Sequence, residues 1–160
     1  EKYVRVFSEM YGLNASILRY YHVYGARQDA GVYGGVIGIF CEKALKNKDI
    51  TIYGDGTQIR SFTYVDDVVN INKLVALKGI KGEAYNCASG LKITINDIAS
   101  KIISLAGSSS AINYEDWKPG DIKDFDVSHQ KLLNLGFSYD FLNFDDGLKA
   151  TFNWYKNNSL

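Results

Sequence analysis

Apolar residues recur at helical spacing along much of the chain. Near the start, Tyr3, Val6, Phe7 and Met10 follow the i, i+3, i+4, i+7 pattern of an amphipathic helix, and Gly12 can end that helix as a left-handed cap. The same reasoning predicts helices from about residue 36 to 45, 66 to 75, 94 to 107 and 145 to 155, and a short one between 128 and 136.

Between the expected helices lie short apolar and aromatic runs that predict strands. These runs are Ala15–Tyr21, read as a buried strand, and Ile50–Tyr53, Ile59–Val65, Glu83–Ala88 and Ile112–Glu115. A tight turn, Gly54-Asp55-Gly56, separates the second and third runs, so these two are expected to form a β-hairpin or a corner. Strands alternate with helices throughout, which predicts the α/β class.

Polar residues at the expected helix starts have a structural explanation. Asp66 or Asp67 can cap the helix that follows, which is simpler than general acid and base chemistry because adjacent residues at a helix start do not face each other. Thr94 with Asp97 resembles a capping box, with Asp in place of the usual Glu. We therefore assign these carboxylates no catalytic role.

Composition and charge narrow the class of protein. With 160 residues, 46% hydrophobic and 22% charged, the chain suits one globular domain. The balance of 18 basic and 18 acidic residues offers no bulk charge to attract nucleic acid or an anionic membrane. No apolar run approaches the ~20 residues of a membrane span, so we expect a soluble, cytoplasmic protein. Because the chain starts inside a helix without a Met, we also expect it to be part of a longer protein.

The cysteines and histidines do not predict a metal site. Cys41 and Cys87 lack the paired spacing of zinc ligands, so buried reduced thiols are expected. The two histidines, His22 and His129, form no cluster. We expect no metal.

Three loops carry candidate binding residues. Arg60 follows the 54–56 turn and could hold a phosphate with two parallel hydrogen bonds, although it could equally be an ordinary surface arginine. The turn Lys118-Pro119-Gly120-Asp121 could offer a cation to a diphosphate and a carboxylate to hydroxyl groups, or be merely a polar turn. His22 opens a glycine-rich loop at residues 22–35, of a kind that often carries a site.

Other familiar site patterns are absent from the sequence. The glycines of the 54–56 turn lack the third glycine and the following helix of a dinucleotide-binding fingerprint, and no P-loop lysine follows them. The chain has no Gly-x-Ser-x-Gly elbow either, so self-contained hydrolytic chemistry is not expected.

The whole chain resembles the C-terminal part of the extended short-chain dehydrogenases that act on nucleotide sugars. The segments that carry the resemblance are YGL at residues 11–13, LRYYHVYGARQ at 18–28, IYGDGTQIRSFTYVDDV at 52–68, YN at 85–86 with Gly90, KPGD at 118–121 and LGF at 135–137. The resemblance implies that residues 1–160 are the substrate-binding portion of an extended Rossmann-type enzyme. It implies that residues 1–12 are the tail of the catalytic and dimer helix, and that the enzyme is a homodimer.

The resemblance also implies a cofactor and roles for individual residues. The cofactor would be NAD, bound mainly by a preceding half that also carries the catalytic Tyr-x-x-x-Lys pair. The implied contacts are Arg60 and Lys118 to the diphosphate, Asp121 to ribose, Thr51 and Tyr53 beside the base, His22 and Val36 in the sugar pocket, and Tyr20 near the nicotinamide. Three residues depart from the family pattern, with His22 in place of Asn, Gly38 in place of Pro and Lys118 in place of Arg.

Several functions remain open at this point. The resemblance favours UDP-glucose 4-epimerase, with dTDP-glucose 4,6-dehydratase and UDP-glucuronate decarboxylase as alternatives, so the substrate would be a UDP- or dTDP-linked sugar. Residues 1–160 alone are expected to be inactive. From another class, a non-catalytic nucleotide-sugar-binding module or a dimerisation unit would share the same features.

Overall fold

The chain alternates helices and strands, as the sequence predicts. We describe residues 1–31, 34–123, 125–139 and 143–158 of a computed structural model. The helices are α1 (Lys2–Tyr11), α2 (Val36–Leu45), α3 (Val65–Lys78), α4 (Ile95–Ala106), α5 (Gln130–Asn134) and α6 (Phe144–Asn158). The strands are β1 (Ile17–Tyr20), β2 (Val23–Tyr24), β3 (Ile50–Tyr53), β4 (Ile59–Arg60), β5 (Thr63–Tyr64), β6 (Ala84–Cys87), β7 (Ile93–Thr94) and β8 (Ile112–Glu115).

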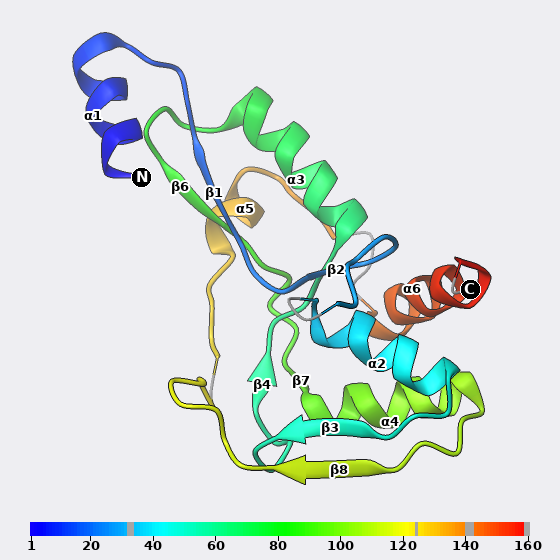
Figure 1. Cartoon of the computed structure of the whole chain (residues 1–160). Coiled ribbons are helices and arrows are strands. Elements are labelled where there is room, and N and C mark those ends of the chain that lie inside the picture. The colour runs from blue at the N-terminus through cyan, green and yellow to red at the C-terminus, as the bar shows by residue number, and fades with distance from the viewer. Residues whose placement is uncertain (32–33, 124, 140–142, 159–160) are drawn as a thin grey trace.

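The strands pair mostly in parallel with partners that are distant in sequence. The pairs β1–β6, β2–β5 and β3–β8 are parallel, and β4–β7 is antiparallel. A parallel pair requires a crossover connection, and helices α3 and α4 lie in the chain between β3 and β8. Figure 1 shows β1 and β6 side by side near one end of the molecule and β3 and β8 near the other. The α/β class is confirmed.

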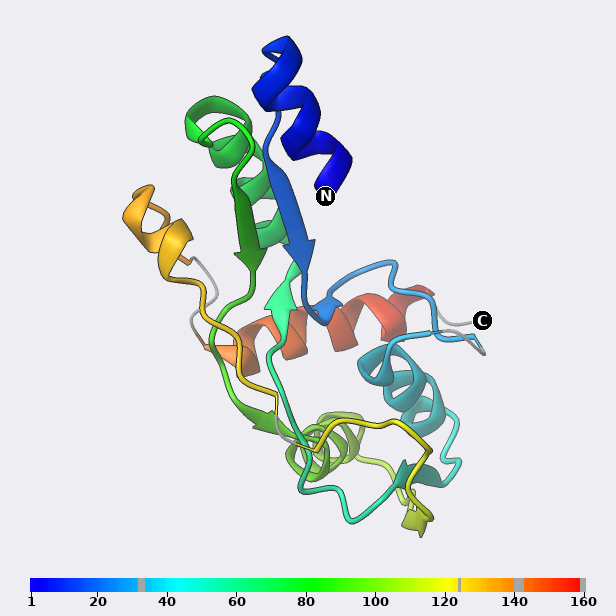
Figure 2. The same ribbon diagram turned by 90° about the vertical axis from the view of Figure 1, so that its left-hand side faces the viewer.

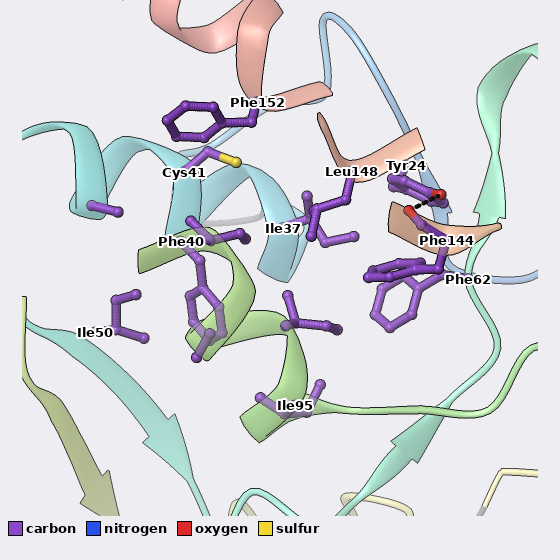
Figure 3. Close-up of a cluster of buried hydrophobic side chains, with 14 of the residues drawn as sticks. Tyr24, Ile37, Phe40, Cys41, Ile50, Phe62, Ile95, Phe144, Leu148 and Phe152 are labelled. Atoms are coloured by element: carbon purple, nitrogen blue, oxygen red, sulfur yellow. Dashed lines mark hydrogen bonds between the residues drawn. The ribbon is translucent and has the colours of Figure 1, made fainter. Parts of the chain in front are cut away.

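The larger hydrophobic core lies among α2, α4, α6 and β3. On α4, Ile95, Ile98 and Ile102 are buried at the spacing of one helix face, and Phe40 of α2 and Leu148 of α6 belong to the same cluster. Figure 3 shows Phe40, Ile95 and Leu148 converging from the three helices. Each fully buried side chain of this size contributes about 1.5–3 kcal/mol, so this cluster fixes the elements that surround the candidate site.

A second, smaller core joins α3, α5 and β6. It contains Val68, Ile71, Tyr85, Cys87 and Leu132. The other cysteine, Cys41, belongs to the first core, and both thiols are free. Burial raises the pKa of each thiol to about 12, so neither is reactive near neutral pH, and the prediction of buried reduced cysteines is confirmed.

Helix α1 turns its apolar side away from the rest of the described chain. Tyr3 and Met10 are 83% and 69% exposed, whereas Ser8 is the buried residue of this helix. Gly12 ends the helix with a φ of 73°, as predicted. Figures 1 and 2 both show α1 at the extremity of the molecule, remote from α2, α4 and α6.

Three local predictions are wrong. Of the predicted hairpin or corner in residues 50–65, the hairpin does not form, because β3 pairs with β8. The following run breaks into β4 and β5, which pair with β7 and β2. Asp66 and Asp67 do not cap α3, because the helix starts at Val65 with Tyr64 as its N-cap, although acidic side chains in the first turn still suit the helix dipole. Strand β1 is only half-buried to exposed, because it has one neighbour, β6.

The prediction for the start of α4 is confirmed. The Thr94 hydroxyl accepts a hydrogen bond from the Asp97 amide at 3.1 Å, and Gly107 ends the helix in the left-handed conformation. Among the described residues, no helix combines the length and apolar composition that a membrane crossing requires.

Candidate functional site

A cavity of about 560 Å³ lies between α2, β3, β4 and the 118–121 turn. Seven of the eight binding residues considered in the sequence line it, namely His22, Val36, Thr51, Tyr53, Arg60, Lys118 and Asp121. The structure therefore brings together residues from five separate segments of the chain. The individual ligand contacts assigned to these residues remain predictions.

Helix α2 supplies one wall of the cavity through a single helix face. Val36, Ile39, Phe40 and Lys43 lie three, four and seven residues apart, and all four line the cavity. Lys43 donates to the Thr51 hydroxyl across a distance of 3.3 Å, which adds a third cation to the site. Sequence reasoning missed Lys43, although the helical spacing from Val36 could have identified it.

Gly38 lies in the first turn of α2, and its surroundings account for glycine in place of the proline expected from the resemblance. A Cβ atom at this position would lie 2.5 Å from the Tyr155 hydroxyl. A larger residue, such as the Pro common in the family, would require Tyr155 to shift. The close packing of α2 against α6 thus accounts for glycine here.

Arg60 and Asp121 form an ion pair at the edge of the cavity. Arg60 Nη2 lies 2.5 Å from Asp121 Oδ1, and the two side chains are only 11% and 28% exposed. The other terminal nitrogen of Arg60, Nη1, donates to the Ile59 carbonyl at 2.8 Å. The guanidinium is therefore held at both ends, with its remaining donors free of hydrogen bonds to the described residues.

The predicted turn at residues 118–121 is present and places two charged groups. The Asp121 amide donates to the Lys118 carbonyl at 3.1 Å, and Gly120 takes a φ of 82°, a conformation that favours glycine at this turn position. Lys118 Nζ lies 3.8 Å from the centre of the Tyr53 ring, within the range of a cation–π interaction. Lys118 and Asp121 thus face the cavity from one short segment.

His22 lies at the bend between β1 and β2 with a φ of 38°. Asn is among the residues that best tolerate positive φ and His is enriched there too, so the backbone accepts His where the family has Asn. The ring packs against Phe62 and Phe125, with centroid separations of 5.5 and 5.2 Å. Partial burial and the charge of Arg60 lower the pKa of His22, so the ring is neutral at pH 7.

Sequence reasoning missed other parts of the cavity wall. Gln58 is buried, donates to the Tyr53 carbonyl at 2.7 Å and leaves its Oε1 atom without a partner in the described structure. Phe62 lines the cavity from the segment between β4 and β5. Of the predicted glycine-rich loop, Gly31 and Gly34 line the cavity, while residues 32 and 33 lie outside the described residues.

A shallower aromatic hollow of about 730 Å³ adjoins this cavity. Tyr53 and Lys118 line both, and Tyr114 and Trp117 complete the hollow together with the acidic residues 115 and 116. Trp117 was not singled out in the sequence. Its ring packs on Gly54, where a Cβ atom would meet it at 2.5 Å.

The 54–56 turn does not form a cradle for a dinucleotide. The glycines of the 54–56 turn face Trp117 and Asn96, whose side chains fill the space that a pyrophosphate would need. Tyr20, the eighth predicted residue, does not line the cavity; it is 55% exposed and donates to Asn72 at 2.9 Å. Its predicted place beside a nicotinamide remains a prediction. The described residues also include no cluster of His, Cys, Asp or Glu suited to a metal ion.

Comparison with known proteins identifies relatives along the whole chain. The NAD dependent epimerase/dehydratase family matches residues 1–88. The chain is 34% identical to the UDP-N-acetyl-alpha-D-glucosaminuronate decarboxylase of Bacillus cytotoxicus over 91% of its own length and 47% of the relative's. The chain spans about half the length of the first curated relatives that it matches.

Solved structures of epimerases share the fold closely. The UDP-glucose 4-epimerase of Thermotoga maritima, solved with UDP-glucose, matches with a TM-score of 0.92 and 32% identity, covering 98% of this chain and 50% of that one. The UDP-N-acetylglucosamine 4-epimerase of Methanobrevibacter ruminantium, in complex with UDP-N-acetylmuramic acid, matches with a TM-score of 0.92 and 35% identity, covering 98% and 51%.

Proposed function

Since this chain belongs to the NAD dependent epimerase/dehydratase family, we propose that it is the nucleotide-sugar-binding portion of a longer enzyme that remodels activated sugars. The observation that carries the proposal is the cavity in which Arg60, Lys118 and Asp121 meet Tyr53. These residues offer two cations, one carboxylate and one aromatic ring. A nucleoside diphosphate sugar presents the matching groups, namely two phosphates, ribose hydroxyls and a base.

The diphosphate is proposed to bind Arg60 and Lys118. Arg60 has a planar fork that can donate two parallel hydrogen bonds to a phosphate, whereas Lys118 offers a point charge without that geometry. Lys43 lines the same cavity and adds positive charge. Arg60 is therefore the residue whose loss should weaken binding most.

The nucleoside is proposed to lie toward the aromatic hollow. Tyr53, Tyr114 and Trp117 provide ring faces there, and Asp121 can accept hydrogen bonds from ribose hydroxyls. Thr51 lies two residues before Tyr53 on β3 and borders the same region. A base held at this end would leave the sugar at the other end of the cavity, near His22 and Val36.

His22 and Val36 are proposed to contact the sugar. The neutral imidazole can either donate or accept a hydrogen bond to a hydroxyl group, and it adds no positive charge beside Arg60. Val36 supplies an apolar wall from the start of α2. A His in place of the family's Asn gives this end of the site a bulkier polar group, which can change the sugar accepted.

The cofactor named in the family description is NAD. Because Trp117 and Asn96 fill the space at the glycines of the 54–56 turn, we propose that NAD is held mainly by another part of the longer protein, with Tyr20 nearest to it. The catalytic Tyr-x-x-x-Lys pair of the family is proposed to lie there too. On this view residues 1–160 bind substrate but do not turn it over alone.

The reaction proposed first is 4-epimerisation of UDP-glucose. A 4,6-dehydratase acting on dTDP-glucose and a decarboxylase acting on UDP-glucuronate are the alternatives within the family. The residues of this cavity are proposed to hold the nucleotide sugar, and the choice between these reactions is proposed to depend on groups near the sugar ring. A UDP-linked substrate is proposed ahead of a dTDP-linked one.

The test uses the full-length protein that contains this chain, assayed for conversion of UDP-glucose to UDP-galactose with NAD. Arg60→Ala should raise KM by roughly 10- to 100-fold, as expected for the loss of a hydrogen bond to a charged group. Lys92→Ala is the control, because Lys92 pairs with Asp126 and does not line the cavity.

The outcomes separate the alternatives. Turnover of dTDP-glucose or UDP-glucuronate in place of UDP-glucose would keep the family and change the reaction. Binding of UDP-sugars without turnover of any of them would favour a non-catalytic module. A native protein that neither binds nor converts any nucleotide sugar would refute the proposed function.

A further inference from the structure

Both cations proposed to meet the diphosphate are already engaged by other side chains of the protein. Arg60 is paired with Asp121 at 2.5 Å, and Lys118 lies over the Tyr53 ring at 3.8 Å. Neither contact belongs to the hydrophobic core, which holds α2, β3 and α4 around the cavity. The positive charge of the site is thus partly neutralised from within.

Asp121 is held firmly in its competing position. Its Oδ1 atom accepts from Arg60 and, at 2.9 Å, from the Ile122 amide. Its own backbone is fixed by the Lys118 turn, which contains Pro119. A phosphate that binds the remaining donors of Arg60 therefore lies beside a negative carboxylate, and a phosphate that displaces Asp121 leaves that carboxylate without its strongest partner.

When a phosphate binds Arg60, the interaction energy that Asp121 loses can be restored by other groups of the same ligand. A carboxylate accepts hydrogen bonds at both oxygens, and Asp121 Oδ2 has no hydrogen bond to the described residues. Hydroxyl groups on the ligand can donate to Asp121 and replace Arg60. A bare diphosphate has no alcohol hydroxyl groups, retains at most one acidic P–OH near neutral pH and adds more negative charge of its own, so repulsion from Asp121 remains.

We propose that Asp121 makes this site select against phosphate compounds that lack hydroxyl groups able to replace Arg60 as its partner. The inference rests on the proposed function and adds a specificity-determining role to it. Inorganic diphosphate is rejected because it cannot compensate Asp121, and a nucleoside diphosphate is accepted because its ribose can. Selectivity then comes from an unfavourable contact with the wrong ligand as well as favourable contacts with the right one.

The opposite role for Asp121 makes a different prediction. If the carboxylate only orients Arg60 for phosphate, its removal should weaken the binding of every phosphate ligand. If it competes with phosphate, its removal should strengthen the binding of inorganic diphosphate. The sign of one change in affinity therefore distinguishes the two roles.

The experiment measures the binding of inorganic diphosphate and of UDP to the full-length protein by isothermal titration calorimetry. Asp121→Asn should bind inorganic diphosphate about tenfold more tightly than the native protein. The affinity for UDP should rise less than that for inorganic diphosphate, or fall, because the carboxylate proposed to accept from ribose is gone. The preference for UDP over diphosphate should therefore fall.

Two matched variants control for charge and folding. Asp121→Glu keeps the carboxylate and should leave inorganic diphosphate weakly bound. Asp126→Asn removes one negative charge from the same segment, outside the cavity lining, and should leave both affinities near the native values. Circular dichroism of each variant checks that the fold is retained.

Unchanged or weaker diphosphate binding by Asp121→Asn, in a protein whose native form binds UDP, would overturn this inference and leave the proposed function standing. The inference would also be overturned if Asp126→Asn tightened diphosphate binding as much as Asp121→Asn does, since the effect would then come from net charge. A native protein that does not bind UDP would overturn both.

Discussion

Single residues in this site act through their neighbours. His22 is neutral at pH 7 because it packs against Phe62 and Phe125 and faces Arg60, and it occupies a backbone conformation that few side chains accept. Arg60 in turn is paired with Asp121. The properties of each group thus depend on contacts between segments far apart in the chain.

The lowered pKa of His22 makes stability depend on pH. Because the unfolded chain takes up the proton more readily, the free energy of unfolding should fall as the pH drops from about 6.5 toward the lower pKa of the folded state. His22→Asn keeps a residue that tolerates positive φ and should flatten this dependence. Urea denaturation at several pH values between 5 and 8 measures it. Equal pH dependence in the two proteins would contradict the prediction.

At the scale of elements, the positions of the helices and of most strands follow their sequence patterns, but the pairing of the strands does not. The apolar residues of α4 lie on one face because their spacing matches the helical period, a property of the local sequence. The strands are two to four residues long, and their partners are decided by tertiary packing. The hairpin prediction failed for this reason, since nothing within residues 50–65 indicates that β8 is the neighbour of β3.

The cap of α4 offers a test of local stabilisation. Thr94→Ala removes the acceptor for the Asp97 amide and should lower the free energy of unfolding by about 1 kcal/mol. Thr94→Ser retains the hydroxyl group and should lose much less. Both values can be obtained from urea denaturation curves. If serine were as destabilising as alanine, the packing of the threonine methyl group, and not the cap, would explain the loss.

Across the whole molecule, the sequence identifies many of the residues of the site but not their contacts. Seven predicted residues line one cavity. They could be predicted because they lie in sequence motifs that resemble those of the family. Three features depend on how separate segments pack together, namely the Arg60–Asp121 pair, the position of Lys118 over Tyr53 and the packing of Phe125 against His22. No local sequence pattern specifies contacts between distant segments, so these contacts could not be predicted from the sequence.

The exposed apolar side of α1 predicts association of the isolated chain. Tyr3, Phe7 and Met10 are exposed on a helix whose buried residue is Ser8. Light scattering of residues 1–160 should show dimers or larger species, and Phe7→Glu with Met10→Glu should shift the population toward monomer. A native chain that stays monomeric as its concentration rises would contradict this. In the full-length protein we expect the same helix to serve a homodimer.

The parallel pairing of β3 with β8 also determines at what stage of synthesis and folding the cavity can be assembled. Ile50 has Ile112 as its partner, and Lys118 and Asp121 follow β8 directly, so a chain that is still being made carries Arg60 and Tyr53 long before their counterparts have left the ribosome. Joining ends so far apart requires the closure of a long loop, which slows folding. The lining of the cavity is therefore completed late, and a product truncated before β8 would lack Lys118 and Asp121.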